Sequence, residues 1–256
     1  FADTKLKGLG VSGDGDTASI GMGQFKHLAR RNMPMVYIVA NNGVYGLTKG
    51  QFSATAEEGL NLKRQGINTY LPVDICMEAL VTNASFVARG FAGDPKQLKN
   101  LLKAALSHDG LAILDIISPC VTFHNKENSY HSYLWGKEHE VQLHDIEFVQ
   151  AREEITVEDF EPGSSKEVTL HDGTIVLMKK LDADYDPTNR YEALRVLEEA
   201  ERQNTLITGL LFVDPNAKTL FDRYNLPDEP LNRLKPEKLR PSKDVLEDLN
   251  RSLFMK

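Results

Sequence analysis

The chain has 256 residues, of which 41% are apolar, and a formal net charge of −7 with both signs mixed along it. This composition is typical of a globular protein, and without a basic patch it argues against a disordered chain or a nucleic-acid binder. The longest largely apolar runs, 35–40 and 111–117 (the second interrupted by Asp115), are too short to span a bilayer. Because only two cysteines occur, Cys76 and Cys120, and Phe1 opens no leader pattern, we expect a cytoplasmic protein.

The first 123 residues are predicted to alternate strands and helices. The predicted strands are 9–12, 35–40 and 111–117, and the predicted helices are 17–31 and one that begins at Pro95. Asp94 is a good N-cap for that last helix, and Pro95 suits its first position. This alternation predicts an α/β fold with a doubly wound, mostly parallel sheet and helices on both faces. Ligands of such sheets bind beyond the carboxyl ends of the strands.

The remainder, 124–256, is expected to complete this fold as a C-terminal extension. It is predicted to contain a hairpin of 168–170 with 174–178, a helix over 188–203, and a strand over 206–213. The tail that begins at Asp214 holds five of the eleven prolines. That tail is interpreted either as an extended arm on a partner subunit or as a surface linker.

Two short motifs follow the first two predicted strands. Gly13-Asp14-Gly15 comes after the first, and Asn41-Asn42 after the second, with 25 residues between Gly15 and Asn41. A carboxylate and a carboxamide on adjacent strand ends are hard oxygen ligands of the kind that Mg²⁺ prefers. Glycines let backbone amides approach a diphosphate, and a helix N-terminus after them favours the same anion. We therefore expect a Mg²⁺-diphosphate clamp on an exposed rim.

Two other interpretations of these residues remain open. The same residues could form an ordinary Asp-Gly turn followed by an Asn helix cap. Gly8, Gly10 and Gly13 also match the dinucleotide-binding fingerprint literally. However, these glycines lie within the predicted strand, and the next strand ends in Asn41-Asn42 rather than in an acidic residue.

The sequence around these motifs resembles that of a known protein family. The spacing of GDG and NN resembles the thiamine-diphosphate signature, and 45–51 read YGLTKGQ. With the run 118–123 (SPCVTF), these segments resemble the β subunits of 2-oxoacid:ferredoxin oxidoreductases. The resemblance is strongest over 1–125 and implies a thiamine-diphosphate-binding fold, with domain 1–123 holding the cofactor and 124–256 contacting the partner subunit.

The resemblance also implies roles for individual residues. Asp14, Asn42 and the Val44 carbonyl are expected to bind Mg²⁺. Contacts to the diphosphate or nearby cofactor atoms are expected from Gly13, Gly15, Asp16, Gly46, Leu47 and Thr48. Leu47 and Lys49 are expected near the thiazolium and the substrate, and a lysine there suits a carboxylate; a solvated loop lysine is the alternative. His27 and Arg30-Arg31 are expected to be structural or to lie at a subunit interface.

Cys120 is expected to be a ligand of a [4Fe–4S] cluster, because the family joins this cysteine to three upstream cysteines. No cysteine precedes Cys76 here. Either the start of the chain is missing or the cluster has been lost, and we expect the first. Cys76 is expected to be a small buried side chain.

The function that the resemblance implies is oxidative decarboxylation of a 2-oxoacid to an acyl-CoA and CO₂, with electrons passed to ferredoxin. The length favours 2-oxoglutarate as the substrate, with pyruvate next. The expected partners are an α subunit (as αβ or α₂β₂), ferredoxin, coenzyme A and the 2-oxoacid, without nucleic acid or membrane. The α subunit is expected to supply the activating glutamate. The alternatives are a non-oxidative thiamine-diphosphate carboligase or decarboxylase and a non-catalytic scaffold subunit.

Overall fold

The computed structural model describes residues 6–127, 129–149, 165–169, 175–180 and 185–254. Its strands are β1 (Gly8–Gly13), β2 (Met35–Asn41), β3 (Val44–Tyr45), β4 (Gln51–Phe52), β5 (Asn61–Leu62), β6 (Gly66–Ile67), β7 (Phe86–Phe91), β8 (Leu111–Ile117), β9 (Glu140–Gln142), β10 (His144–Val149), β11 (Ser165–Thr169), β12 (Ile175–Lys180) and β13 (Leu206–Val213). Its helical segments are the π-helical turn η1 (Gly15–Ile20), α1 (Met22–Arg31), α2 (Ile75–Val81), α3 (Pro95–Ser107), α4 (Tyr133–His139), α5 (Arg190–Gln203), α6 (Leu220–Arg223), the 3₁₀ turn η2 (Leu231–Arg233), α7 (Pro236–Leu239) and α8 (Lys243–Phe254).

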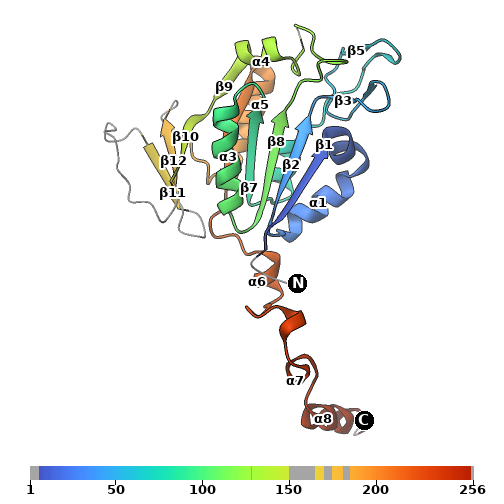
Figure 1. Ribbon diagram of the computed structural model, residues 1–256, viewed down its shortest axis with the longest axis vertical. Helices are drawn as coiled ribbons and strands as arrows, with labels where there is room; N and C mark the ends of the chain where they lie inside the picture. The colour runs from blue at the N-terminus through green and yellow to red at the C-terminus, as the bar shows by residue number, and fades with distance from the viewer. Residues whose placement is uncertain (1–5, 128, 150–164, 170–174, 181–184, 255–256) are drawn as a thin grey trace.

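The main sheet has six strands in the order β1-β2-β8-β7-β13-β9 (Figure 1). The first four are parallel to one another, β13 runs antiparallel to β7, and β9 runs parallel to β13. The mostly parallel, doubly wound α/β fold is therefore confirmed. Asn41 at the end of β2 lies beside Ile117 at the end of β8, so the segments that follow these two strands begin at one edge of the sheet.

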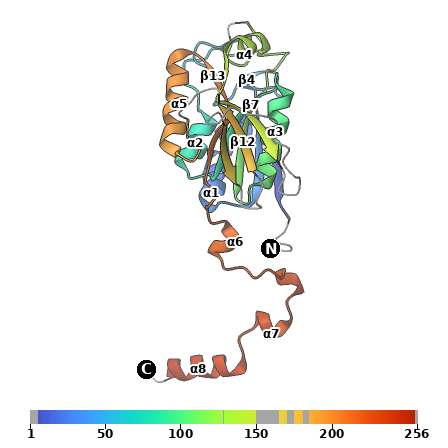
Figure 2. The ribbon, with the colours of Figure 1, turned by 90° about the vertical axis from the view of Figure 1, so that its left-hand side faces the viewer.

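Helices cover both faces of this sheet (Figure 2). α1, α2 and α5 pack on one face, where Phe25, Leu80 and Leu197 belong to one buried cluster. α3 packs on the other face, where Leu101 and Ala105 belong to a second cluster. Successive residues of a strand point to opposite faces, which allows the central strands to contribute to both clusters. A strand buried on both faces is expected to be apolar throughout, as β8 and β13 largely are.

Several predicted elements agree with the structure, and one boundary was wrong. The strands predicted over 111–117 and 206–213 are β8 and β13, and α3 begins after Asp94, whose side chain accepts from two backbone amides. The helix predicted over 17–31 is instead the turn η1 followed by α1. Gly21 separates them: its amide donates to the Asp16 carbonyl at 2.6 Å, and a Cβ there would lie 2.5 Å from that oxygen.

Four elements between 56 and 94 were not predicted, namely the short strands β5 and β6, the helix α2 and the strand β7. All six residues of β7 are buried, including Arg89, and this charge interrupts the apolar run that would mark a buried strand. Further along, β11 and β12 pair antiparallel, as predicted for the hairpin, while its expected turn at 171–173 lies outside the described residues.

The C-terminal segment extends away from the sheet as an arm that carries α6, α7 and α8 (Figures 1 and 2). α6 is held at its start by a capping box between Thr219 and Asp222. α8 exposes Leu246, Leu249 and Leu253. Within the described residues, we find no helix whose length and apolar character would let it cross a membrane.

Candidate functional site

Asp14 lies between the end of β1 and the start of η1 and accepts hydrogen bonds from two loops. Its Oδ2 accepts from the Gly43 amide at 3.0 Å, from Thr55 Oγ1 at 2.6 Å and from Ser53 Oγ. Among the described residues, its Oδ1 has a single, longer contact, 3.4 Å from the Asn42 amide. The carboxylate therefore has one oxygen fixed by the protein and another with coordination capacity left.

The expectation that Asp14 lies on an exposed rim was wrong. Its exposed fraction is 1%, because the chain folds over it between β2 and β5 and supplies the donors. A buried carboxylate with several donors is held in one orientation. Removing it would leave those donors unpaired, so this side chain contributes to the fold as well as to any cofactor site.

Asn42 lies beside Asp14, whereas its neighbour Asn41 points elsewhere. Asn42 Oδ1 accepts from the Val44 amide at 3.0 Å, which holds the carboxamide at the edge of the sheet. Asn41 is buried and donates through Nδ2 to Asp115 Oδ1 at 3.0 Å. Asp14 and Asn42 are thus brought together as predicted. Val44 begins the short strand β3, two residues after Asn42.

The glycines beside Asp14 leave space in one direction only. A Cβ on Gly13 would meet nothing closer than Asp16 Oδ2, at 4.0 Å. A Cβ on Gly15 would lie 2.4 Å from the ring of Tyr45, whose hydroxyl donates to the Gly15 carbonyl at 2.8 Å. Gly13 thus borders open space, and Gly15 is required for close packing against the loop from β2.

The loop 46–50 is solvent-exposed at the residues expected near the substrate. Leu47 is 99% exposed, and Thr48 and Lys49 are also exposed. Lys49 adopts a positive φ of 77°, and the Gly50 amide donates to the Tyr45 carbonyl at 3.0 Å, which closes the turn. The turn presents these side chains away from the core of this chain.

The two cysteines lie in different surroundings. Cys76 is fully buried on α2, as predicted, and burial raises the pKa of its thiol. Cys120 is half-buried just beyond β8, where the His124 amide donates to the Cys120 carbonyl at 2.8 Å. The Ser118 amide donates to the Asn41 carbonyl at 2.7 Å, which joins this segment to the end of β2.

A cluster of Glu57, His124 and His131 was not predicted. It contacts Asn41 and Asn42 at the end of β2. Glu57 Oε1 is 3.1 Å from His124 Nε2, and Glu57 Oε2 is 2.9 Å from His131 Nδ1. Burial raises the pKa of Glu57, but the contacts with both histidines outweigh it and hold that pKa well below its usual range. The two histidines follow the SPC run in the sequence, but nothing there indicates that Glu57 meets them.

Asn41 also contacts a buried ion pair in the main sheet. Asp115 on β8 accepts from Arg89 Nε at 3.0 Å, and Arg89 Nη2 donates to Asp74 at 2.7 Å. Burial raises the pKa of Asp115, while Arg89 and Asn41 oppose that rise. This chain of contacts fixes the orientation of the Asn41 carboxamide, because a carboxylate accepts hydrogen bonds and the Asn41 nitrogen, not its oxygen, must therefore face Asp115.

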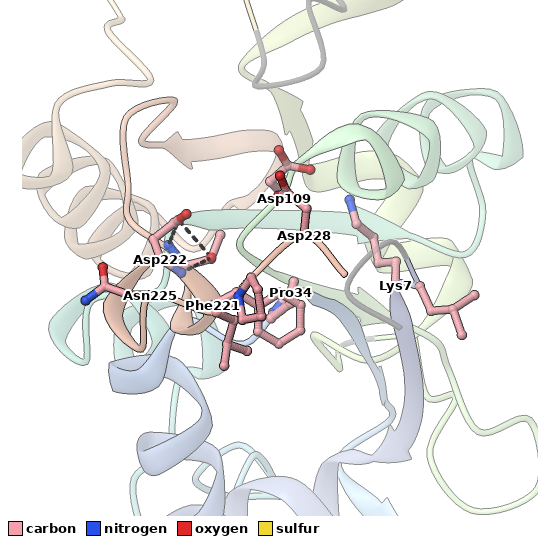
Figure 3. Close-up of a pocket in the computed structure, with 11 residues that line it drawn as sticks. Lys7, Pro34, Asp109, Phe221, Asp222, Asn225 and Asp228 are labelled. Carbon is pink, nitrogen blue, oxygen red and sulfur yellow. Dashed lines mark hydrogen bonds between the residues drawn. The ribbon is translucent and has the colours of Figure 1, made fainter. Parts of the chain in front are cut away.

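A separate pocket lies at the opposite end of the sheet (Figure 3). It is lined by Lys7, Pro34 and Asp109 from the segments around the amino ends of the strands, and by Phe221 and Asp228 from the start of the C-terminal arm. Ligands of open α/β sheets bind at the carboxyl ends of the strands, so we do not assign the cofactor to this pocket.

The N-terminal half of the chain is similar to known proteins. Residues 2–116 match the family described as "Thiamine pyrophosphate enzyme, C-terminal TPP binding domain". The chain is 43% identical over 134 residues to the 2-oxoacid:ferredoxin oxidoreductase subunit beta of Saccharolobus solfataricus, covering 50% of this chain and 43% of that protein. It is 34% identical over 123 residues to the 2-oxoglutarate synthase subunit KorB of Archaeoglobus fulgidus, covering 48% of this chain and 46% of that protein. The matches therefore span under half the length of these curated relatives.

A solved structure resembles a larger part of the chain. The 2-oxoglutarate:ferredoxin oxidoreductase from Magnetococcus marinus, with 2-oxoglutarate, coenzyme A and succinyl-CoA bound, superposes with a TM-score of 0.63 at 27% identity. This similarity covers 93% of this chain and 65% of that one. The resemblance thus extends into the half that the curated relatives do not match.

Proposed function

We propose that this chain is the thiamine-diphosphate-binding subunit of a 2-oxoacid:ferredoxin oxidoreductase, because its N-terminal half is similar to the β subunits of these enzymes. The observation that carries the proposal is the pairing of Asp14 with Asn42 at the ends of neighbouring parallel strands, 3.4 Å apart between Asp14 Oδ1 and the Asn42 amide. This pairing lies within the residues that match the thiamine-pyrophosphate-binding family.

The residues fit a Mg²⁺-diphosphate group. Asp14 Oδ1 and the Asn42 carboxamide are hard oxygens with coordination capacity left, which Mg²⁺ prefers, and the Val44 carbonyl is proposed as a third ligand. Gly13, Gly15, Asp16 and the start of η1 would hold the diphosphate through backbone amides and a helical N-terminus. When bound, thiamine diphosphate supplies the carbanion chemistry that decarboxylation of a 2-oxoacid needs. The protein's own part is to hold and orient the group.

The exposed loop is proposed to complete the site on the side facing a partner. Gly46, Leu47 and Thr48 would contact the cofactor, and the Lys49 ammonium would hold a substrate carboxylate. In support, no described residue forms an ion pair with Lys49, and an apolar side chain as exposed as Leu47 suits a contact that another subunit covers. The proposed substrate is 2-oxoglutarate, with pyruvate next.

Partner subunits are proposed for the same reason. The edge strand β1 exposes Leu9 and Val11, and Ile20 is exposed on the neighbouring turn η1. An apolar edge of this kind suits an interface with an α subunit. Coenzyme A and ferredoxin are proposed as the acyl and electron acceptors of the assembled enzyme. Both cysteines are free, which favours a reducing, cytoplasmic setting.

Cys120 is proposed as one ligand of a [4Fe–4S] cluster. It is half-buried and close to the end of β8, whereas Cys76 is enclosed in the core. The described residues therefore offer one thiolate at this edge, and the other ligands would come from outside them. The cluster would carry electrons toward ferredoxin.

The test is to assemble the chain with its α subunit and to measure ferredoxin reduction that depends on 2-oxoglutarate and coenzyme A. Reduction that requires thiamine diphosphate and Mg²⁺ supports the proposal. Consumption of the 2-oxoacid without reduction of an acceptor would instead indicate a non-oxidative carboligase or decarboxylase. An assembly that binds no thiamine diphosphate would indicate a scaffold subunit.

A further inference from the structure

Glu57, His124 and His131 form a cluster that the proposed reaction does not use. Glu57 comes from the loop after β4, and both histidines come from the segment between β8 and α4. Their potential ligand atoms all lie within 4.8 Å of one another. The two imidazoles are 0% and 1% exposed, and the Glu57 side chain is 24% exposed. Two segments far apart in the sequence thus meet at one compact, largely buried group of nitrogen and oxygen donors.

Hydrogen bonds on the far sides of the rings determine which nitrogens face Glu57 with a lone pair. His124 Nδ1 lies 2.8 Å from the Asn42 carbonyl, which only accepts, so Nδ1 carries the proton. His131 Nε2 lies 3.0 Å from Asn41 Oδ1, an atom identified as oxygen because the Asn41 nitrogen donates to Asp115. In neutral rings, His124 Nε2 and His131 Nδ1 are therefore both unprotonated.

Two lone pairs and one carboxylate then converge on the same point. The Ser129 hydroxyl contacts both His124 Nε2, at 2.6 Å, and Glu57 Oε1, but its single proton can satisfy only one of them. A divalent cation satisfies all three donors at once, and the partners at the far nitrogens are the kind that orient metal-bound histidines.

We propose that Glu57, His124 and His131 bind one Zn²⁺ or a chemically similar divalent transition metal. Two imidazoles and a carboxylate are a known donor set for Zn²⁺, with a fourth position for water or a hydroxyl. The Ser129 hydroxyl, which contacts His124 Nε2, would be a candidate for that fourth position. The bound ion would hold the loops that carry Glu57 and the histidines against the end of β2.

The backbone beside the cluster accommodates this arrangement. Gly43 has a φ of 74°, and a Cβ there would lie 2.8 Å from His124 Cε1 and 3.1 Å from His131 Nδ1. The same Gly43 donates its amide to Asp14. The metal site and the proposed Mg²⁺ site are therefore neighbours with different donors: imidazoles in one and hard oxygens in the other.

The first experiment is calorimetric titration of Zn²⁺ into EDTA-treated full chain, without thiamine diphosphate. We expect one equivalent to bind. Glu57→Gln and His131→Gln should each weaken binding by roughly 100-fold, at or above the effect of losing an outer-sphere partner. His27→Gln, on the exposed face of α1, and Asp14→Asn should leave the affinity unchanged. If the Asp14 variant alone loses the ion, Zn²⁺ was occupying the proposed Mg²⁺ site and this proposal is wrong.

The second experiment does not depend on the variants folding. X-ray absorption at the zinc edge of the wild-type protein should show two imidazoles and oxygen, and anomalous diffraction should locate the ion between Glu57 and the two histidines. Ligation by the sulfur of Cys120, an ion at another position, or no stoichiometric ion would each overturn the proposal. None of these results depends on the oxidoreductase activity, so the two proposals fail separately.

Discussion

Arg89 on β7 and Asp115 on β8 lie directly opposite each other in the parallel register and form a buried ion pair, with Arg89 Nε 3.0 Å from Asp115 Oδ2. The other oxygen of Asp115 accepts from Asn41 Nδ2. Asn41 Oδ1 in turn lies 2.9 Å from Thr55 Oγ1, which is 2.6 Å from Asp14. A charge pair in the centre of the sheet is thus connected by side chains to the edge where the cofactor is proposed to bind.

Arg89→Met should destabilise the fold by about 3–5 kcal/mol, because it leaves the Asp115 carboxylate buried without its cation. Urea unfolding at pH 7 measures this loss. Burial raises the pKa of Asp115 from 3.8, so without Arg89 the group favours its neutral form. The deficit of the variant should therefore shrink as pH falls toward 3.8 and grow as pH rises. A loss below about 1 kcal/mol at pH 7 would contradict the buried charge.

Asp14→Asn should weaken Mg²⁺-dependent thiamine diphosphate binding on the order of 100-fold, about 2.7 kcal/mol, because it removes the charged ligand. The amide keeps one oxygen for the Gly43 and Thr55 donors, so the fold should survive better than in Asp14→Ala. Calorimetric titration of the cofactor measures the change. Asp109→Asn, exposed at the other end of the sheet, is the control. Equal affinities in both variants would remove Asp14 from the site.

The thiols should react unequally. Burial raises the pKa of the Cys76 thiol, so it stays protonated and enclosed at pH 8, whereas half-buried Cys120 is accessible. A chromogenic disulfide reagent should modify one thiol in the native chain and two in guanidinium chloride. Two reactive thiols in the native chain would mean that α2 does not cover Cys76.

Cys120→Ser should bleach or shift the broad visible absorption of the iron-loaded enzyme, because it removes a proposed cluster ligand. Cys76→Ser is the matched control and should leave the spectrum unchanged. If the wild-type assembly contains no iron, the cluster and the electron route through it are wrong.

Lys49→Met should lower kcat/KM roughly ten- to hundredfold, the equivalent of a lost charge-assisted hydrogen bond of about 1.5–3 kcal/mol. Cofactor affinity should be spared. Lys63→Met, on another exposed loop, is the control. A larger loss with 2-oxoglutarate than with pyruvate would place the ammonium at the distal carboxylate, and equal losses would place it beside the ketone. Unchanged kinetics with both substrates would make Lys49 a solvated loop residue.

The sequence by itself determined the α/β fold and the location of the proposed cofactor site. Buried parallel strands such as β8 are predicted from runs that are largely apolar, and the ends of such strands are predicted to hold ligands. The GDG and NN motifs are local in sequence, so their placement on neighbouring strand ends followed from the strand–helix alternation alone.

Only the tertiary structure decided what surrounds those motifs. Asp14 is buried because Ser53 and Thr55, about forty residues away in the chain, fold over it. Glu57 meets His131 across 74 positions, and Arg89 meets Asp115 across 26. These pairings are set by loop closure and strand register rather than by local periodicity, so no pattern within a short window of sequence predicts them.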